Sequence, residues 1–253
     1  MSNPAGNYPG RQIFVGALES GEPAFAYFVS GRSAGSQGRY ISPFLPQENA
    51  VRIKPINPNE KFDQFRHYQA VKIDLETGTL VVSNSQAPVD ATLEAFVYKG
   101  KESAEAIEYK EFLQRLLVAI GPEYDSKEKP TSRIVGGIIP SKPRIGILAI
   151  TDRNSHAIAK HFPLKPGHLA SVSTYDGNID YRNFNSYELC DPKYVVKASA
   201  TNPKDLADEI YGMSDYIDPK HGELRVAVVA GIDNGNGPGG WNIAIRNRHK
   251  FPA

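Results

Sequence analysis

A stretch rich in glycine and serine, from Ala26 to Arg39, carries residue types that are well suited to hold a phosphate. It reads AYFVSGRSAGSQGR, so an apolar strand runs into a loop that contains Arg32, Ser33 and Arg39. Small residues let the backbone approach a ligand closely, and guanidinium groups pair with phosphate oxygens through parallel hydrogen bonds. The stretch indicates a phosphate-binding loop, and a strand-to-strand turn with two solvated arginines fits the same spacing.

The elements that must position this loop are predicted to be mostly strands. Apolar or alternating segments flank short turn signals at three places, which is typical of hairpins. The predicted hairpins pair Gln12–Leu18 with Ala24–Ser30, Tyr68–Leu75 with Thr79–Ser83, and Ile134–Ile139 with Arg144–Ile150. Further strands are predicted at Leu169–Tyr175, Val195–Ala200, Leu224–Ala230 and Trp241–Arg246.

Helical signals occur between these strands. Ser103 can cap a helix over Ala104–Ile120, whose apolar residues share one face. Asn202 can cap a second helix over Pro203–Met213, in which proline takes the first helical position. A weaker helical pattern covers Val89–Tyr98. Hairpins with a few inserted helices predict an α+β fold, and this many strands favour two packed sheets.

Length and charge narrow the class of protein. The chain has 253 residues, which we interpret as one domain over 1–253 with a flexible leader over 1–7. Lys and Arg total 29 while Asp and Glu total 28, and the resulting net charge of +1 predicts no nucleic-acid partner. No apolar run approaches the ~20 residues that span a bilayer, and no signal-peptide pattern opens the chain. These features predict a cytoplasmic protein without a membrane partner.

Several catalytic and ligand-binding motifs are disfavoured. Cys190 is the single cysteine and the six histidines are scattered, so neither a disulfide nor a metal site is expected. Gly235–Gly240 matches G-x-G-x-x-G, but a predicted strand follows it where a dinucleotide site needs a helix. We interpret it as a flexible hairpin loop near the site. Removal of Met1 would make Ser2 an N-terminal nucleophile, but the flexible leader expected around it disfavours that chemistry.

Seven short motifs occur in order along nearly the whole chain. They are Tyr8-Pro9-Gly10-Arg11 with Phe14-Val15-Gly16, Ala26-Tyr27 through Gly31-Arg32-Ser33 to Arg39, Tyr68-Gln69-Ala70, Val81-Val82-Ser83-Asn84, Thr131-Ser132-Arg133-Ile134, Ser173-Thr174-Tyr175, and Asp233-Asn234-Gly235 with Gly240-Trp241-Asn242. In this order the motifs resemble those of the stand-alone, archaeal-type IMP cyclohydrolases and their bacterial relatives. The chain departs from that pattern where Ser132 replaces a proline, and in extra, irregular length at 42–65 and 176–194.

The resemblance implies both a fold and a reaction. The implied fold is a four-layer α-β-β-α sandwich like that of the N-terminal nucleophile hydrolases, used without self-processing. The implied reaction closes the purine ring of 5-formamidoimidazole-4-carboxamide ribotide to inosine monophosphate with loss of water. The expected partner is therefore a small purine ribonucleotide, no cofactor is expected, and a homo-oligomer is left open.

The site residues implied by the resemblance form a catalytic set and a binding set. Arg39 and Tyr68 would polarise the formyl oxygen, with Tyr68 as proton donor, and Asp125 would act as base, with Glu123 and Glu128 as alternatives. The binding set is Arg32, Ser33, Asn84, Arg133, Tyr175, Asp233 and Asn234. Within it, Arg32, Ser33 and Arg133 would hold the phosphate and ribose, while Asn84 would orient the carboxamide.

Simpler interpretations of these residues stay open. Tyr68 can be a core tyrosine with a satisfied hydroxyl, Asn84 a turn residue at a strand end, and Arg133 a solvated edge arginine. Two other functions are also compatible with the sequence. One is a purine-nucleotide-binding protein without turnover on the same scaffold, and the other is an amide hydrolase that uses Ser2.

Overall fold

The computed structural model describes part of the chain, and the fold is given for that part. The described residues are 10–31, 37–57, 59, 67–84, 133–140, 144–151, 157–174, 200–213, 217–218 and 222–249. The predicted helices over Ala104–Ile120 and Val89–Tyr98 lie outside these residues, as does the predicted strand Val195–Ala200 apart from Ala200.

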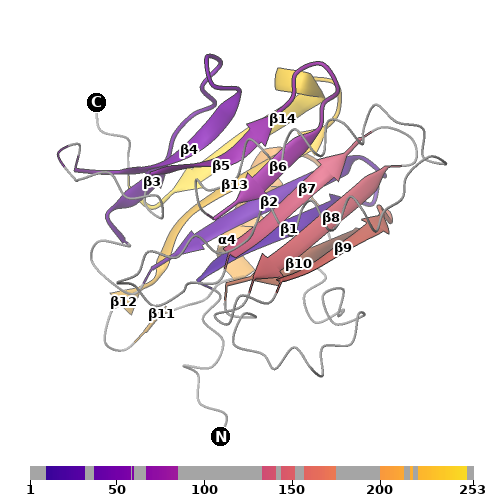
Figure 1. Ribbon diagram of the computed structural model, residues 1–253. Coiled ribbons are helices and arrows are strands. Elements are labelled where there is room, and N and C mark those ends of the chain that lie inside the picture. Colours follow the sequence, from indigo (N-terminus) through magenta and orange to yellow (C-terminus); the bar gives the residue numbers. More distant parts are fainter. Residues whose placement is uncertain are drawn as a thin grey trace, which may run out of the picture.

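Most described residues belong to two antiparallel sheets (Figure 1). The five-stranded sheet has the order β10-β1-β2-β13-β14, and the seven-stranded sheet has the order β3-β4-β5-β6-β7-β8-β9. The strands of the first sheet are β1 (Arg11–Ala17), β2 (Pro23–Ser30), β10 (His168–Ser173), β13 (Arg225–Asp233) and β14 (Trp241–Asn247). Those of the second are β3 (Arg39–Ile41), β4 (Ala50–Pro55), β5 (Tyr68–Ile73), β6 (Leu80–Ser83), β7 (Arg133–Ile139), β8 (Ile145–Thr151) and β9 (Ala157–Pro163). A short pair, β11 (Ile217–Asp218) and β12 (Gly222–Glu223), is separate from both.

All three predicted hairpins are confirmed. Strand β1 pairs with β2, β5 with β6, and β7 with β8, each antiparallel and within a residue or two of the predicted bounds. Both strands of the β7–β8 hairpin are buried along their apolar residues, as continuous hydrophobic runs predict. Local alternation and turn residues were sufficient here because a hairpin joins neighbours in sequence.

The structure corrects the interpretation of 42–65 as irregular. Strand β4 lies inside this region, and β3 precedes it, so the pair forms one edge of the seven-stranded sheet. The alternation along β4 is short, and its register against β5 shifts between Val51 and Arg52. The extra residue at this shift is Ala70 of β5, and the alternation of β4 itself covers only the four residues from Val51 to Lys54, which is too short to identify a strand from the sequence.

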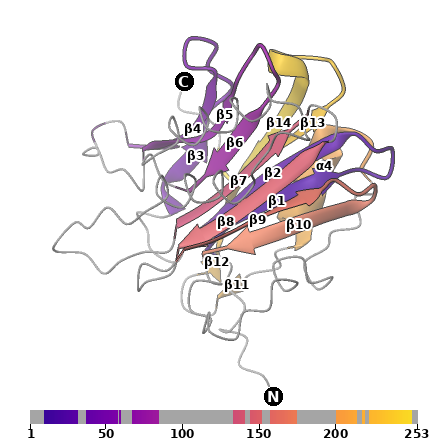
Figure 2. The ribbon, with the colours of Figure 1, turned by 45° about the vertical axis from the view of Figure 1, so that its right-hand side comes forward.

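Helix α4 (Pro203–Met213) confirms the second predicted helix. The Asn202 side-chain oxygen accepts a hydrogen bond of 2.9 Å from the backbone N–H of Asp205, which is the expected cap. Its apolar side packs Leu206 and Ile210 against Phe28 and Val228 of the five-stranded sheet. Figure 2 shows α4 on the side of that sheet away from β7 and β8. The described residues therefore form a helix layer over two sheet layers, and the fourth layer of the implied sandwich stays a prediction.

The main hydrophobic core lies between the two sheets. Ile13, Val15 and Phe25 of the first sheet pack in one cluster with residues such as Ile53 of the second. At Gly136 the sheets approach so closely that a Cβ atom would lie 2.5 Å from Ile13 Cγ2 and 3.1 Å from Val15 Cγ2. Close contact of the sheets holds the polar residues at their ends in fixed relative positions.

The Asn247 side chain joins the edge strands of the two sheets. Its amide oxygen accepts from the backbone N–H of Ile41 at 2.8 Å, and its amide nitrogen donates to the Ile41 carbonyl at 2.9 Å. Ile41 is fully buried, so Asn247→Ala would leave two backbone groups without these partners. We expect a loss of about 1–3 kcal/mol of unfolding free energy in urea titrations. Asn242→Ala on the same strand serves as the control, and equal losses in both variants would contradict a specific bridge.

Candidate functional site

Four predicted site residues lie at the same end of the seven-stranded sheet. Arg39 begins β3, Tyr68 begins β5, Asn84 directly follows β6, and Arg133 begins β7. Neighbouring strands run in opposite directions, so the start of one strand lies beside the end of the next. The structure thus gathers residues from four separate sequence motifs at one end of the sheet.

A cluster of two tyrosines and two arginines crosses from one sheet to the other at this end, and Arg11 is its only partly exposed member. The Tyr68 and Tyr27 hydroxyl oxygens are 2.7 Å apart, and either hydroxyl can be the donor. The Arg11 guanidinium carbon lies 5.7 Å from the centroid of the Tyr68 ring. Both tyrosines are fully buried and Arg39 is 4% exposed. Of these residues, the five-stranded sheet contributes Arg11 and Tyr27, and the seven-stranded sheet contributes Arg39 and Tyr68.

The electrostatics of the cluster keep Tyr27 neutral. Burial is the largest influence and raises the pKa of Tyr27 well above its ordinary value, and the neighbouring Tyr68 acts in the same direction. The positive charges of Arg11 and Arg39 oppose this shift. A neutral phenol beside two guanidinium groups can donate hydrogen bonds to a developing negative charge, as an oxyanion site requires.

Asn84 has a structural contact with the next strand. Its side-chain oxygen accepts from the backbone N–H of Ile134 at 2.9 Å, and its own N–H donates to the Ile134 carbonyl at 3.3 Å. Asn84 is 2% exposed, and its amide extends the β6–β7 pairing beyond the end of β6. The oxygen is committed to the backbone, so orientation of a carboxamide by Asn84 stays a prediction.

Arg133 is buried, which argues against a solvated edge arginine. Its exposure is 4%, and Ile134 beside it belongs to the core between the sheets. Side chains alternate between the two faces of a strand, so Arg133 lies on the face of β7 away from the buried tyrosine cluster. The arginine shares the sheet end with Tyr68 but approaches it from the other side of the sheet.

Asp233 and Asn234 lie at the opposite end of the sandwich. Strand β13 pairs Val229 with Tyr27, and Asp233 follows four residues later, about 13 Å further along the strand. Burial raises the pKa of the Asp233 carboxyl, and the positive charge of Arg144 opposes the shift. Asn234 is exposed, and its side-chain oxygen accepts from the backbone N–H of Asn236 at 3.1 Å. The position of this pair does not support contact with the same ligand as Arg39 and Tyr68.

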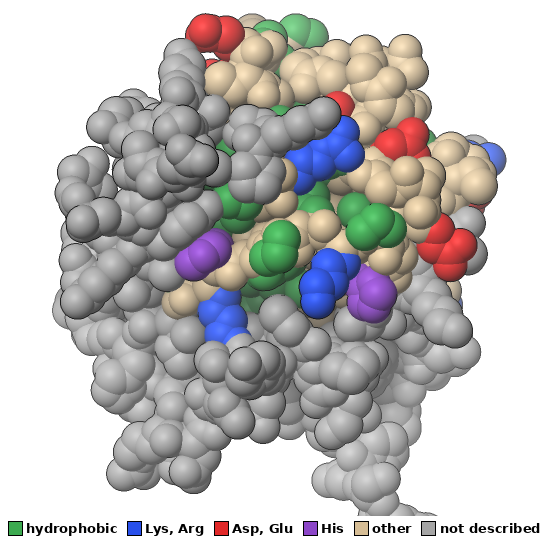
Figure 3. All heavy atoms as spheres, turned by 90° about the vertical axis from the view of Figure 1, so that its right-hand side faces the viewer, with side chains coloured by type: hydrophobic (Ala, Val, Ile, Leu, Met, Phe, Trp, Pro, Cys, Tyr) green, Lys and Arg blue, Asp and Glu red, His purple; other side chains and the backbone are tan. Residues whose placement is uncertain are grey.

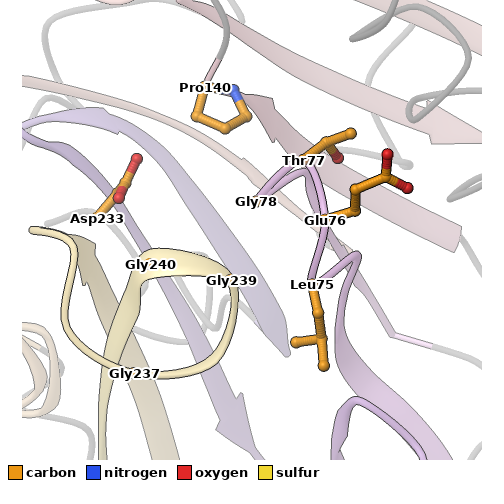
Figure 4. A pocket seen from close by; sticks show the side chains of 9 residues that line it. All are labelled: Leu75, Glu76, Thr77, Gly78, Pro140, Asp233, Gly237, Gly239 and Gly240. Atoms are coloured by element: carbon orange, nitrogen blue, oxygen red, sulfur yellow. The ribbon is translucent and has the colours of Figure 1, made fainter.

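A shallow pocket of about 540 Å³ occupies this opposite end (Figure 4). Leu75, Glu76, Thr77, Gly78, Pro140, Asp233, Gly237, Gly239 and Gly240 line it. The glycine-rich loop over 235–240 joins β13 to β14, which confirms the predicted hairpin loop, but the loop is far from the tyrosine cluster rather than near it. A Cβ atom at Gly239 would lie 2.8 Å from Ile73 Cγ2, so the glycines allow this loop to pack on the β5–β6 turn.

The remaining predicted site residues lie outside the described part of the chain. They are Arg32, Ser33, Asp125 and Tyr175, together with the alternative acids Glu123 and Glu128. The described residues that flank them are informative, because β2 ends at Ser30 and β10 ends at Ser173. Asn84 and Arg133 flank the stretch that contains the three acids. Each of these flanking points lies at the Tyr68 end of the sandwich.

Arg11 and Tyr27 were not predicted as site residues. Arg11 belongs to the first sequence motif and Tyr27 to the second, but each also fits a strand of mainly apolar residues. A usable signal was present in β2. Tyr27 lies two residues from both Phe25 and Val29, so all three side chains share the face that packs between the sheets. A polar tip at an inward position requires a partner, and that partner is Tyr68.

The described residues contain no candidate metal-binding site. Across them, no three His, Cys, Asp or Glu side chains are grouped so that they could hold an ion. Within the same residues, no helix combines the length and apolarity needed to cross a membrane.

Figure 3 shows the described part of the face to the right in Figure 1, where cationic and histidine side chains lie beside hydrophobic ones and acidic side chains lie toward the rim.

Comparisons with known proteins identify the family. A structural match to Anbu from Hyphomicrobium sp. strain MC1 covers 87% of this chain and 81% of that chain, at 11% identity and a TM-score of 0.31. A search of curated proteins finds no match. The model of the family described as IMP cyclohydrolase-like protein matches residues 8–232, which includes all the sheet residues described above except Asp233 and β14. The chain therefore belongs to the IMP cyclohydrolase-like protein family.

Proposed function

We propose that the protein is an IMP cyclohydrolase that closes the ring of 5-formamidoimidazole-4-carboxamide ribotide and releases water. The observation that carries the proposal is the buried Tyr27–Tyr68 contact, with the positive charges of Arg11 and Arg39 beside it, in a member of this family. The carboxamide nitrogen attacks the formyl carbon of the same molecule, so the protein needs no nucleophile of its own. Its tasks are to bring the two groups together and to stabilise the oxyanion that forms.

Arg39 and Tyr68 are assigned to the formyl oxygen. The guanidinium group of Arg39 would hold the oxygen as negative charge develops, and the Tyr68 hydroxyl would donate a proton to it. Because Tyr68 is fully buried, the substrate can reach its hydroxyl only when the enclosing side chains rearrange on binding. Asp125 is proposed as the base for the carboxamide N–H, with Glu123 and Glu128 as the alternatives.

Arg32, Ser33 and Arg133 are proposed to bind the phosphate and ribose. The chain leaves β2 at Ser30, and two peptide units allow the Cα atom of Arg32 to lie at most about 7 Å from that of Ser30. A planar guanidinium suits a phosphate with several oxygens better than an ammonium does. The phosphate would then lie at the Tyr68 end of the sandwich rather than beside the glycine-rich loop over 235–240.

Arg32→Ala tests the phosphate contact. Loss of a charge-assisted pair is expected to weaken binding of inosine monophosphate on the order of 10- to 100-fold, because the dianion loses its strongest donor. Binding of the matching nucleoside, inosine, should change little, since it carries no phosphate. Isothermal titration of both ligands to wild type and variant decides the point, and equal losses for the two ligands would falsify the assignment.

Turnover of the ribotide by the purified wild-type protein tests the function itself. We expect the purine chromophore to appear on addition of the formylated ribotide, at a rate proportional to protein concentration. Binding of inosine monophosphate without turnover would instead support a purine-nucleotide-binding protein. Absence of both would refute the proposal, and loss of an amidase activity in Ser2→Ala would support an amide hydrolase.

A further inference from the structure

Tyr27 makes a polar contact across the two sheets, where the apolar core meets the charges of Arg11 and Arg39. It lies on β2 between Phe25 and Val29, which belong to the same core cluster. Its hydroxyl oxygen lies 2.7 Å from that of Tyr68, which is 41 residues away in the sequence and on the other sheet. Phenylalanine would fill the same space without a polar group to desolvate, so the hydroxyl calls for an explanation beyond packing.

The direction of the hydrogen bond decides what Tyr68 can do. Each phenol has one O–H donor and can also accept. If Tyr68 donates to Tyr27, the proton of Tyr68 is directed into the core. If Tyr27 donates, the proton of Tyr68 is left to point elsewhere, and the Tyr68 oxygen accepts the bond. Once Tyr68 has given its proton to the substrate its oxygen can only accept, so the 2.7 Å contact must then be made by the Tyr27 O–H.

We propose that Tyr27 is a positioning residue that donates its hydrogen bond to the Tyr68 oxygen and so leaves the Tyr68 proton for the substrate. This inference rests on the proposed function. Arg11, 5.7 Å from the Tyr68 ring centroid, and Arg39 supply positive charge around the same pair. Tyr27 itself touches Tyr68 rather than the reacting atoms.

The proton-transfer step balances without any further reactant. In the dehydration of the cyclic intermediate, the carbon–oxygen bond breaks and the Tyr68 O–H proton joins the departing hydroxyl, which leaves as water. The adjacent ring nitrogen releases its proton to the base as the carbon–nitrogen double bond forms. The Tyr68 phenolate is stabilised by the hydrogen bond from Tyr27 and by the nearby guanidinium groups, and proton exchange with the base then restores Tyr68.

A double-mutant cycle on the full chain tests the inference. Tyr27→Phe is expected to lower kcat on the order of 10- to 100-fold with little change in KM, because one hydrogen bond to a developing charge is lost. In the Tyr68→Phe background the same substitution should change kcat less than twofold, because Tyr27 acts only through the Tyr68 hydroxyl. A purely structural tyrosine would lower kcat by the same factor in both backgrounds or would raise KM.

Tyr211→Phe on α4 is the matched control, since Tyr211 is a third buried tyrosine and lies in a separate core cluster. It should leave kcat and KM unchanged.

If circular dichroism shows that Tyr27→Phe does not fold, incorporation of 3-fluorotyrosine at position 27 keeps the ring and makes the hydroxyl a stronger donor. That variant should match or exceed the wild-type kcat, and a tenfold fall would overturn the inference. Wild-type turnover with an unaffected Tyr27→Phe variant refutes the inference alone, while absence of wild-type turnover refutes the proposed function as well.

Discussion

Replacing Tyr68 with phenylalanine is expected to lower kcat on the order of 10²–10³-fold with little change in KM. The hydroxyl is assigned to the formyl oxygen, where its hydrogen bond strengthens only as charge develops. Loss of a contact of this kind raises the barrier without weakening substrate binding. Initial rates of purine formation over a range of ribotide concentrations separate kcat from KM.

Tyr68→Phe also has a predicted effect on stability. The substitution removes the 2.7 Å contact of the Tyr27 hydroxyl and leaves that hydroxyl in the core. We expect a loss of about 1–3 kcal/mol of unfolding free energy, measured by urea titration. Activity must therefore be compared under conditions where both proteins are folded. An unchanged kcat in folded protein would remove Tyr68 from the chemistry and restore its interpretation as a core tyrosine.

Arg39→Met is expected to lower kcat to a similar extent, on the order of 10²–10³-fold. Methionine retains much of the side-chain length but removes the charge and the planar set of donors. Arg39 is 4% exposed at the start of β3, and its charge acts on the buried tyrosine pair. A guanidinium held in such surroundings stabilises an oxyanion more than it would in water.

Two further variants make the Arg39 test specific. Arg39→Lys keeps the positive charge but loses the planar guanidinium with its parallel N–H donors. Its kcat should therefore fall between those of wild type and Arg39→Met. Arg52→Met is the control, since Arg52 lies on the neighbouring strand β4 and pairs with Glu48 there. If Arg39→Met and Arg52→Met reduced kcat equally, the effect would belong to general charge removal rather than to the site.

Local sequence patterns were sufficient for the elements whose partners are close in the chain. The β1–β2, β5–β6 and β7–β8 hairpins and helix α4 follow from alternation, turn residues and a cap, all of which act over a few residues. The same local rules failed at β4, whose alternation covers only the four residues from Val51 to Lys54. That strand is specified by its neighbours in the sheet rather than by its own pattern.

The amino-acid sequence alone determined the family, the hairpins and the residue types available for phosphate and oxyanion contacts, because these depend on local order along the chain. Only the tertiary structure decided which of those residues meet. It joined Tyr27 to Tyr68 across two sheets and placed Asp233 at the far end of β13, although all three lie in recognisable motifs. The physical reason is that alternation specifies the face of a strand, whereas the contact between two sheets depends on packing among residues distant in sequence.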